Sequence, residues 1–273
     1  EKRFAISMII VFFIFHIFIW FAHGASAIRK TNDSFLFKIT IGWLISVLYT
    51  TISYFSAAFS NPGFLTEDWN EKNPSKKVDT TDKDDKLFCD KCKISRPPRT
   101  HHCKTCNKCV LMMDHHCIFI DNCVGFRTFR PYFAFLVGFP LEGIFGMIMM
   151  VCNIDKVNKN AFEGIVFGLS AMYYGIFLLI DFYQLFSLLS NMIHNSSEVE
   201  NERDNDQKPE YELMGIRQVS EFDTGSLFTN IKQKLGDFPL TWLFPLPRNG
   251  DYFIMPKNPK FVPYSKVKLK KST

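Results

Sequence analysis

The chain has 273 residues, of which 47% are hydrophobic and 16% aromatic, and it carries a formal net charge of +5 at pH 7. The apolar residues gather in four long blocks instead of being dispersed, which excludes an ordinary soluble domain. Positions 60–131 carry thirteen of the 32 Lys and Arg residues and positions 190–273 carry twelve, whereas segments 24–34 and 153–163 carry two each. We therefore interpret the positive charge as a membrane-orientation signal, with both termini and segment 60–131 in the cytosol, and not as a nucleic-acid-binding surface.

The first two apolar blocks, Phe4–Ala22 and Leu36–Phe59, predict membrane-spanning helices. Each has about the length that crosses a hydrocarbon core of ~30 Å. A secretory signal peptide is the alternative for the first block, but its apolar run is too long and no small-residue cleavage site follows. The missing initiator methionine suggests that the sequence begins inside a longer chain. In the second block, small and hydroxyl side chains share one helix face and are expected to pack against another helix: Gly42, Ser46, Thr50 and Ser53.

A polar linker is predicted at residues 60–86, because 66–86 is mixed in charge and poor in aromatic residues. The segment that follows, 87–131, holds seven of the eight cysteines of the chain and four of its seven histidines. Disulfides rarely persist in the cytosol, so clustered cysteines there indicate metal binding or reactivity.

The cysteine spacing in this segment indicates zinc. Two residues separate Cys89 from Cys92 and Cys103 from Cys106, which lets both thiolates of a tight turn reach one Zn²⁺ at about 2.3 Å. Structural zinc takes four ligands, so two sites need eight of the eleven Cys and His side chains and leave three over. A segment this short has no hydrophobic core of its own. We therefore expect metal binding to supply most of its folding free energy, on the order of 10 kcal/mol or more per site.

The sequence Asp114-His115-His116-Cys117 adds a reactive combination. A carboxylate, an imidazole and a thiol are the parts of an activated nucleophile, and a neighbouring imidazole raises the thiolate fraction of a cysteine near neutral pH. The alternative is a membrane-tethered zinc scaffold, such as a RING-like ligase or an adaptor, which needs no additional cysteine. A nucleic-acid-binding zinc finger is a third interpretation, but the chain lacks the His-x3–5-His helix of the C2H2 class.

Two further spans are predicted at Tyr132–Cys152 and Ile165–Leu189. Glu142 and Asp181 are acids inside these spans, and we expect them to bond to Tyr or Ser side chains on neighbouring helices. The predicted fold class is an α-helical polytopic membrane protein with four transmembrane helices and a cytosolic two-zinc Cys-rich domain between helices 2 and 3. Its expected organisation is transmembrane helices 1 and 2 at 4–59, the linker at 60–86, the Cys-rich domain at 87–131, transmembrane helices 3 and 4 at 132–189, and a cytosolic C-terminal region at 190–273.

With these motifs the chain resembles the DHHC protein S-acyltransferases, also called palmitoyltransferases, over nearly its whole length. The resemblance covers the spans, the Cys-rich segment between the second and third span, and the cytosolic tail. It implies that Cys117 is the nucleophile, that His115 is its base and that Asp114 orients His115. It also implies two structural zinc ions, one on Cys89, Cys92, His102 and Cys109 and the other on Cys103, Cys106, His116 and Cys123.

The chain departs from the family pattern outside these residues. Phe119 stands where the family usually has Trp, and Thr128 stands where an Asn usually follows the glycine turn. The family's Thr-Thr-x-Glu element resembles residues 195–198, and its C-terminal element resembles residues 222–230. The resemblance therefore implies supporting roles for Ser196 and Asn230.

The activity that the resemblance implies is transfer of a palmitoyl or other long-chain acyl group from acyl-CoA to cysteines of membrane-associated proteins. The reaction would pass through an acyl-Cys117 intermediate with ping-pong kinetics. We hypothesise that Arg96, Arg99 and His101 contact the CoA phosphates; the alternative is a solvated basic face opposite anionic lipid. The expected partners are acyl-CoA, protein substrates and the bilayer, without nucleic acid. The expected location is an endomembrane (Golgi, ER or vacuole-like) in preference to the plasma membrane, and the sequence leaves the organelle open.

Overall fold

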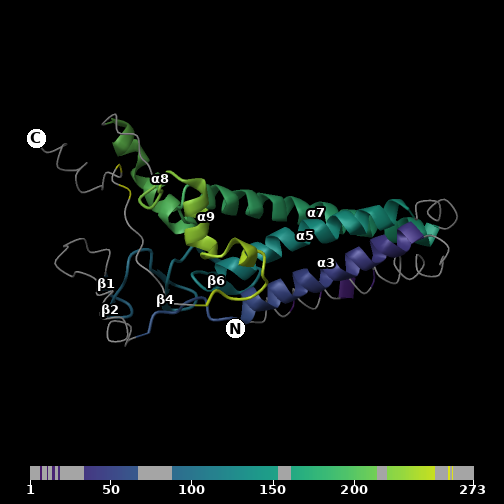
Figure 1. Cartoon of the computed structure of the whole chain (residues 1–273), viewed down its shortest axis with the longest axis horizontal. Coiled ribbons are helices and arrows are strands. Elements are labelled where there is room, and N and C mark those ends of the chain that lie inside the picture. Colours follow the sequence, from purple (N-terminus) through teal and green to yellow (C-terminus); the bar gives the residue numbers. More distant parts are fainter. Residues whose placement is uncertain are drawn as a thin grey trace, which may run out of the picture.

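The computed structural model describes residues 34–66, 88–152, 161–213 and 220–249, with Ser7, Val11, Ile14, Phe15, Phe18, Asn258 and Lys260. Three long helices form one elongated arm of the molecule: α3 (Ser34–Phe59), α5 (Phe129–Val151) and α7 (Ala161–Ile193) (Figure 1). Each contains a stretch long and apolar enough to cross a membrane, at Phe35–Phe59, Phe129–Val151 and Gly164–Ile193. The last three predicted blocks are therefore confirmed as long apolar helices.

The predicted first span, Phe4–Ala22, lies mostly outside the described residues. The five positions that are described within it are helical. Among them, Phe15 stacks on Tyr173 of α7 with ring centroids 4.0 Å apart, and Val11 reaches the same region of the bundle. The described contacts thus connect the first block to α7, and the number of spans stays a prediction.

Helix α5 lies between α3 and α7 and packs against both. The close approach to α3 depends on small residues, because a Cβ at Gly138 would come within 2.7 Å of Thr50 Oγ1. Gly42 of α3 likewise faces the ring of Phe145. Thr50 and Ser53 are fully buried, so the predicted packing face of the second block is confirmed.

The Cys-rich segment consists of three short antiparallel hairpins at one end of the arm (Figure 1). Residues with a positive φ, Lys93, Asn107 and Asp121, turn the chain within each hairpin. Cys89, Cys103 and Cys117 recur fourteen residues apart at corresponding places, so the segment repeats one knuckle three times. The paired strands are β1 (Phe88–Cys89) with β2 (Ile94–Ser95), β3 (His101–Cys103) with β4 (Lys108–Val110), and β5 (His115–Cys117) with β6 (Asn122–Val124).

The beginning of the predicted linker packs onto these hairpins. Phe64 forms an isolated β-bridge with Val110, and the backbone N–H of Leu65 donates to the Cys109 carbonyl at 2.9 Å. Residues 67–87, which contain most of the polar stretch, lie outside the described residues. The segment directly after α3 therefore holds the Cys-rich domain against the end of that helix.

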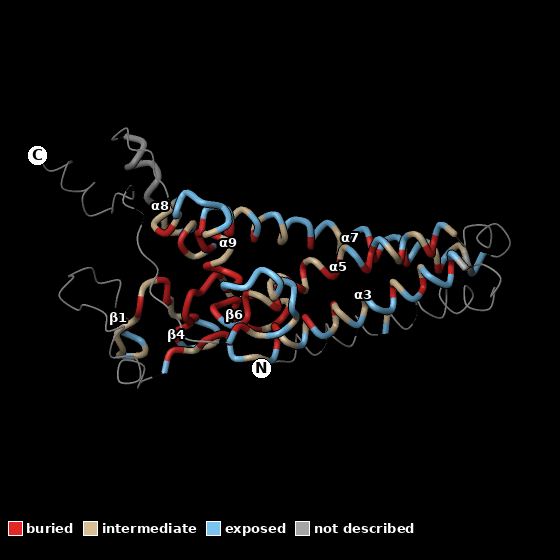
Figure 2. Tube along the Cα trace, in the orientation of Figure 1, coloured by how far each residue is buried: buried red, intermediate tan, exposed pale blue. Residues whose placement is uncertain are grey.

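The C-terminal region covers the hairpins with α8 (Glu198–Leu213), α9 (Leu227–Leu235) and the short 3-10 helix η4 (Pro239–Thr241). Ser226 caps the N-terminus of α9 by accepting from the Thr229 N–H, and Gly236 ends the helix at φ 105°. Helix α9 packs against α7 and α5. The buried residues concentrate at this junction between the hairpins and the helix ends (Figure 2). Its core includes Ala57, Cys117, Phe129, Leu188 and Leu235, so Cys117 is held where all these parts meet.

Candidate functional site

Two groups of Cys and His side chains converge to form candidate zinc sites. Within each group the ligand atoms lie within 4.8 Å of one another. His102 Nδ1 is 3.3 Å from Cys92 Sγ, and His116 Nδ1 is 3.5 Å from Cys103 Sγ. Tetrahedral zinc with bonds of about 2.0–2.3 Å would place neighbouring ligands roughly 3.5–3.8 Å apart, so both groups could bind zinc. The groups are Cys89, Cys92, His102 and Cys109, and Cys103, Cys106, His116 and Cys123, the sets that the resemblance implied.

The strand pairing explains how each group is assembled. His102 is paired with Cys109 across β3 and β4, and His116 is paired with Cys123 across β5 and β6. Each pair faces the Cys-x2-Cys turn of the preceding hairpin. The first group therefore joins hairpins one and two, and the second joins hairpins two and three. Asp121 Oδ1 lies 3.8 Å from His116 Nε2, in the position of a carboxylate that orients a ligating imidazole.

Cys117 occupies the place in the third hairpin that Cys89 and Cys103 occupy in the first two. In those hairpins the backbone N–H of Cys92 or Cys106 points at the first sulfur, at 3.4 and 3.3 Å. At the corresponding place the third hairpin has Ile120, so the second thiol is missing. The turn remains, and its backbone N–H groups at Phe119 and Ile120 help to lower the pKa of the Cys117 thiol. The turn that contributes thiols to the candidate zinc groups in the first two hairpins thus presents Cys117 outside both groups in the third.

Asp114, His115 and Cys117 lie together as predicted. His115 Nδ1 is 3.0 Å from Asp114 Oδ2. Burial alone would lower the pKa of His115, but its hydrogen bonds with Asp114 and Cys117 raise it to about 10. Burial works against ionisation of Cys117, yet the hydrogen bond with His115 and the turn N–H groups hold the pKa of the thiol below its usual value. The arrangement favours a thiolate beside an imidazolium.

Lys234 of α9 is a part of this site that sequence reasoning missed. Its side chain is fully buried, and its Nζ lies 3.7 Å from Asp114 Oδ1 and donates to the Ser196 carbonyl at 2.6 Å. Burial alone would raise the pKa of Asp114, but His115 and Lys234 hold it below its usual value. A lysine in a short amphipathic helix carries no sequence signal of such a contact. The ammonium keeps Asp114 ionised while Asp114 orients His115.

The two predicted supporting residues, Ser196 and Asn230, lie where α9 meets the end of α7, next to Lys234. The Ser196 hydroxyl donates to Asn191 Oδ1 at 3.4 Å, and its carbonyl holds Lys234. The Asn230 amide donates to the Ile193 carbonyl and to Asp223 Oδ1, both at 2.7 Å. These contacts connect α9 to the end of α7. They keep the Lys234 side chain in place.

Of the three residues predicted to contact CoA, Arg99 is buried among protein groups, which favours a structural role. Its buried guanidinium donates to both carboxylate oxygens of Glu200 at 2.8 Å and to the side chain and backbone of Asn195. It also lies over the Phe222 ring, 4.6 Å from the centroid. Arg96 and His101 are partly exposed. The phosphate contact stays a prediction for all three, with Arg99 the least suited by geometry.

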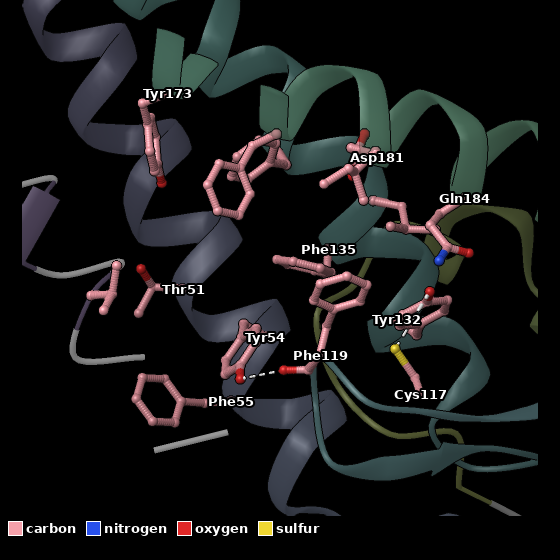
Figure 3. Close-up of a pocket in the computed structure, with 15 residues that line it drawn as sticks. Thr51, Tyr54, Phe55, Cys117, Phe119, Tyr132, Phe135, Tyr173, Asp181 and Gln184 are labelled. Carbon is pink, nitrogen blue, oxygen red and sulfur yellow. Dashed lines mark hydrogen bonds between the residues drawn. The ribbon is translucent and has the colours of Figure 1, made fainter. Parts of the chain in front are cut away.

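An apolar cavity begins beside Cys117 and extends among α3, α5 and α7 (Figure 3). The Tyr54 hydroxyl donates to the Phe119 carbonyl at 2.9 Å and holds Phe119 in the wall. Aromatic and aliphatic side chains dominate the lining, including Phe135, Leu136, Phe139, Phe177 and Ile180. The cavity suits a long apolar chain with its reactive end at the cysteine.

Asp181 also lines this cavity, which the sequence did not predict. It is 6% exposed, and its Oδ2 atom has no hydrogen-bond partner among the described residues. The Tyr or Ser partner expected for it is therefore not found at that oxygen. Glu142, the other predicted intramembrane acid, is fully buried in α5.

Comparison with known proteins agrees with this geometry. A family model described as DHHC palmitoyltransferase matches residues 82–205. The chain is 33% identical over 165 residues to a probable protein S-acyltransferase 15 of Arabidopsis thaliana, covering 58% of this chain and 63% of that protein. It is 40% identical over 126 residues to palmitoyltransferase swf1 of Schizosaccharomyces pombe, covering 43% of this chain and 32% of that protein. The chain thus spans less than two thirds of the length of these relatives.

Proposed function

We propose that the chain, which a DHHC palmitoyltransferase family model matches over residues 82–205, is a protein S-acyltransferase that moves a long-chain acyl group from acyl-CoA to protein cysteines. One observation carries the proposal. Cys117 is a thiol outside both candidate zinc groups, it lies beside the Asp114–His115 pair, and it lines the end of an apolar cavity. A purely structural zinc domain does not require a free thiol beside an Asp–His pair at the end of an apolar cavity.

The reaction begins with Cys117 as a thiolate and His115 holding its proton. The sulfur attacks the thioester carbon of acyl-CoA and forms a new C–S bond, the bond to the CoA sulfur breaks, and His115 returns the proton to the departing CoA thiolate. Asp114 and Lys234 keep the imidazole oriented throughout. A substrate cysteine then gives its proton to His115 and attacks the acyl-Cys117 thioester. A new bond forms between the acyl carbon and the substrate sulfur, the bond to the Cys117 sulfur breaks, and Cys117 returns as a thiolate beside the protonated His115.

The two zinc ions are structural in this proposal. Bound to the two Cys and His groups, zinc supplies the links that hold the three hairpins in series. The converging ligand atoms and the interleaved pairing support the assignment. Cys117 would then depend on zinc for its position and not for its reactivity.

The membrane arrangement extends beyond the described spans. The proposal has four transmembrane helices, with Phe4–Ala22 as the first. The protein would lie in an endomembrane, with both termini and the Cys-rich domain on the cytosolic side. Acyl-CoA and membrane-associated proteins are the substrates. The asymmetry of Lys and Arg supports the orientation, and the contact of Phe15 with α7 supports the additional helix. Arg96 and His101 are the better placed of the predicted CoA contacts because the Arg99 guanidinium is held by Glu200.

A labelling experiment tests the function. Purified protein in detergent, incubated with radiolabelled palmitoyl-CoA, is expected to take up label that neutral hydroxylamine releases, because a thioester is cleaved under those conditions. Cys117→Ser is expected to lose the hydroxylamine-labile label, and Cys152→Ser is expected to keep it. Cys152 is the matched control because it is the other cysteine outside the zinc groups. Labile label that persists in Cys117→Ser, or its absence from the unmodified protein, would reject the proposal.

A further inference from the structure

Tyr132 presents an unassigned hydroxyl to the nucleophile. It is the fourth residue of α5 and is 2% exposed. Its hydroxyl lies 3.9 Å from Cys117 Sγ, and its ring meets the His115 ring edge-on with centroids 5.6 Å apart. Figure 3 shows the hydroxyl pointing to the end of the cavity that Cys117 lines. Tyr132 is therefore in contact with both reacting parts of the site.

The Tyr132 hydroxyl has unused capacity as a donor. Within the described part of the chain its hydrogen-bond partner is the Cys117 sulfur, and that contact has the thiol donating to the tyrosine oxygen. A buried tyrosine hydroxyl usually donates to a nitrogen or oxygen acceptor. The cavity wall near it carries Phe135 and Leu136 on α5 and the polar Asp181 and Gln184 on α7 (Figure 3), and among the described residues neither polar side chain hydrogen-bonds the Tyr132 hydroxyl. The O–H group is thus placed for an acceptor that arrives with the substrate.

We propose that Tyr132 donates the hydrogen bond that stabilises the oxyanion formed when Cys117 attacks the acyl thioester. The inference rests on the proposed function. As the C–S bond forms, the carbonyl electron pair moves onto oxygen; when the bond to the CoA sulfur breaks, that pair re-forms the carbonyl. The oxyanion lies two bonds from the Cys117 sulfur. A donor 3.9 Å from that sulfur can reach it at the roughly 2.7–3.1 Å of an effective donor.

A second role for the same hydroxyl has to be separated from this one. Tyr132 could donate to the Cys117 thiolate and stabilise the nucleophile itself, without acting on the oxyanion. The two roles differ in which reactions they affect. Alkylation by iodoacetamide attacks a saturated carbon and forms no oxyanion, whereas acylation forms one. A thiolate role affects both reactions, and an oxyanion role affects acylation alone.

The test uses Tyr132→Phe, which removes the hydroxyl and keeps the ring against His115. In a Cys152→Ser background, the single-turnover rate of acyl-enzyme formation from palmitoyl-CoA is compared with the rate of Cys117 alkylation by iodoacetamide. Acylation is expected to fall about 10- to 100-fold, and alkylation is expected to change less than about twofold. Unchanged alkylation also shows that the variant is folded.

The control is Tyr183→Phe, which makes the same chemical change at an outward-facing tyrosine of α7 that is 72% exposed, and it should alter neither rate. Acylation that persists at the wild-type rate in Tyr132→Phe overturns the inference. A parallel fall of both rates also overturns it and indicates the thiolate role. If the unmodified protein forms no acyl-enzyme, the proposed function fails first and the inference fails with it.

Discussion

Cys103→Ala is expected to unfold the Cys-rich segment, whereas Cys117→Ala is expected to leave it folded. The two cysteines hold corresponding places in successive hairpins, so the substitutions remove the same atoms from the same backbone shape. Cys103 belongs to the second zinc group and Cys117 to neither. Loss of a ligand weakens a site that contributes on the order of 10 kcal/mol to folding.

Limited trypsin digestion of the detergent-solubilised proteins measures this difference. Lys104 and Lys108 are exposed residues of the second hairpin and become cleavable when the hairpin opens. Rapid cleavage at these lysines is expected for Cys103→Ala and for the unmodified protein after zinc chelation. Cys117→Ala should resist as the untreated protein does. Equal resistance of the two variants would show that zinc does not hold the hairpins.

Removing either member of the Arg99–Glu200 pair is expected to destabilise the protein strongly. The side chains are 1% and 5% exposed, and the guanidinium reaches both carboxylate oxygens. Burial alone would raise the pKa of Glu200, but Arg99 holds it below its usual value, so the pair is ionised. A single substitution leaves a buried charge without its partner, which costs about 3–5 kcal/mol. The double variant Arg99→Met with Glu200→Leu should recover much of the loss.

Heat unfolding of the single and double variants tests this prediction and separates it from the CoA hypothesis. If Arg99 stabilises the fold, both single variants unfold at a lower temperature and the double variant unfolds between them and the parent. Lys104→Met, at an exposed position of the same segment, is the control and should not change the midpoint. If Arg99 instead contacts the CoA phosphates, Arg99→Met keeps its unfolding midpoint and raises the KM for palmitoyl-CoA.

The sequence was most informative where a local pattern determines the structure. A membrane-spanning helix needs only length and apolar composition, so the helices at 36–59, 132–152 and 165–189 could be predicted to within a few residues. Zinc is indicated by the Cys-x2-Cys turns, whose geometry is fixed over four residues, whereas the division of the ligands into two groups was implied by the family resemblance. The neighbouring Asp and His residues marked Cys117 as a candidate nucleophile, whereas the family resemblance was needed to assign one histidine to zinc and the other to catalysis.

The contacts behind the nucleophile could not be predicted, because they join residues far apart in the chain. Lys234 contacts Asp114, although 120 positions separate them in the sequence, and Glu200 contacts Arg99 over a separation of 101 positions. The sequence of a short helix does not distinguish an exposed lysine from a buried one. An arginine beside a predicted zinc site suggests phosphate binding when its ion-pair partner is unknown. Tyr132 was likewise hidden within an aromatic block. Such contacts depend on how α8 and α9 pack, which no local pattern specifies.

The zinc content of purified Cys117→Ala is the most direct test of the division between bound and reactive cysteines. The account predicts two zinc ions per chain in this variant, as in the unmodified protein, together with complete loss of acyl-enzyme formation. A variant that retains fewer than two zinc ions would show that Cys117 is itself a ligand, and the assignment of Cys117 as the acylated nucleophile would then be wrong.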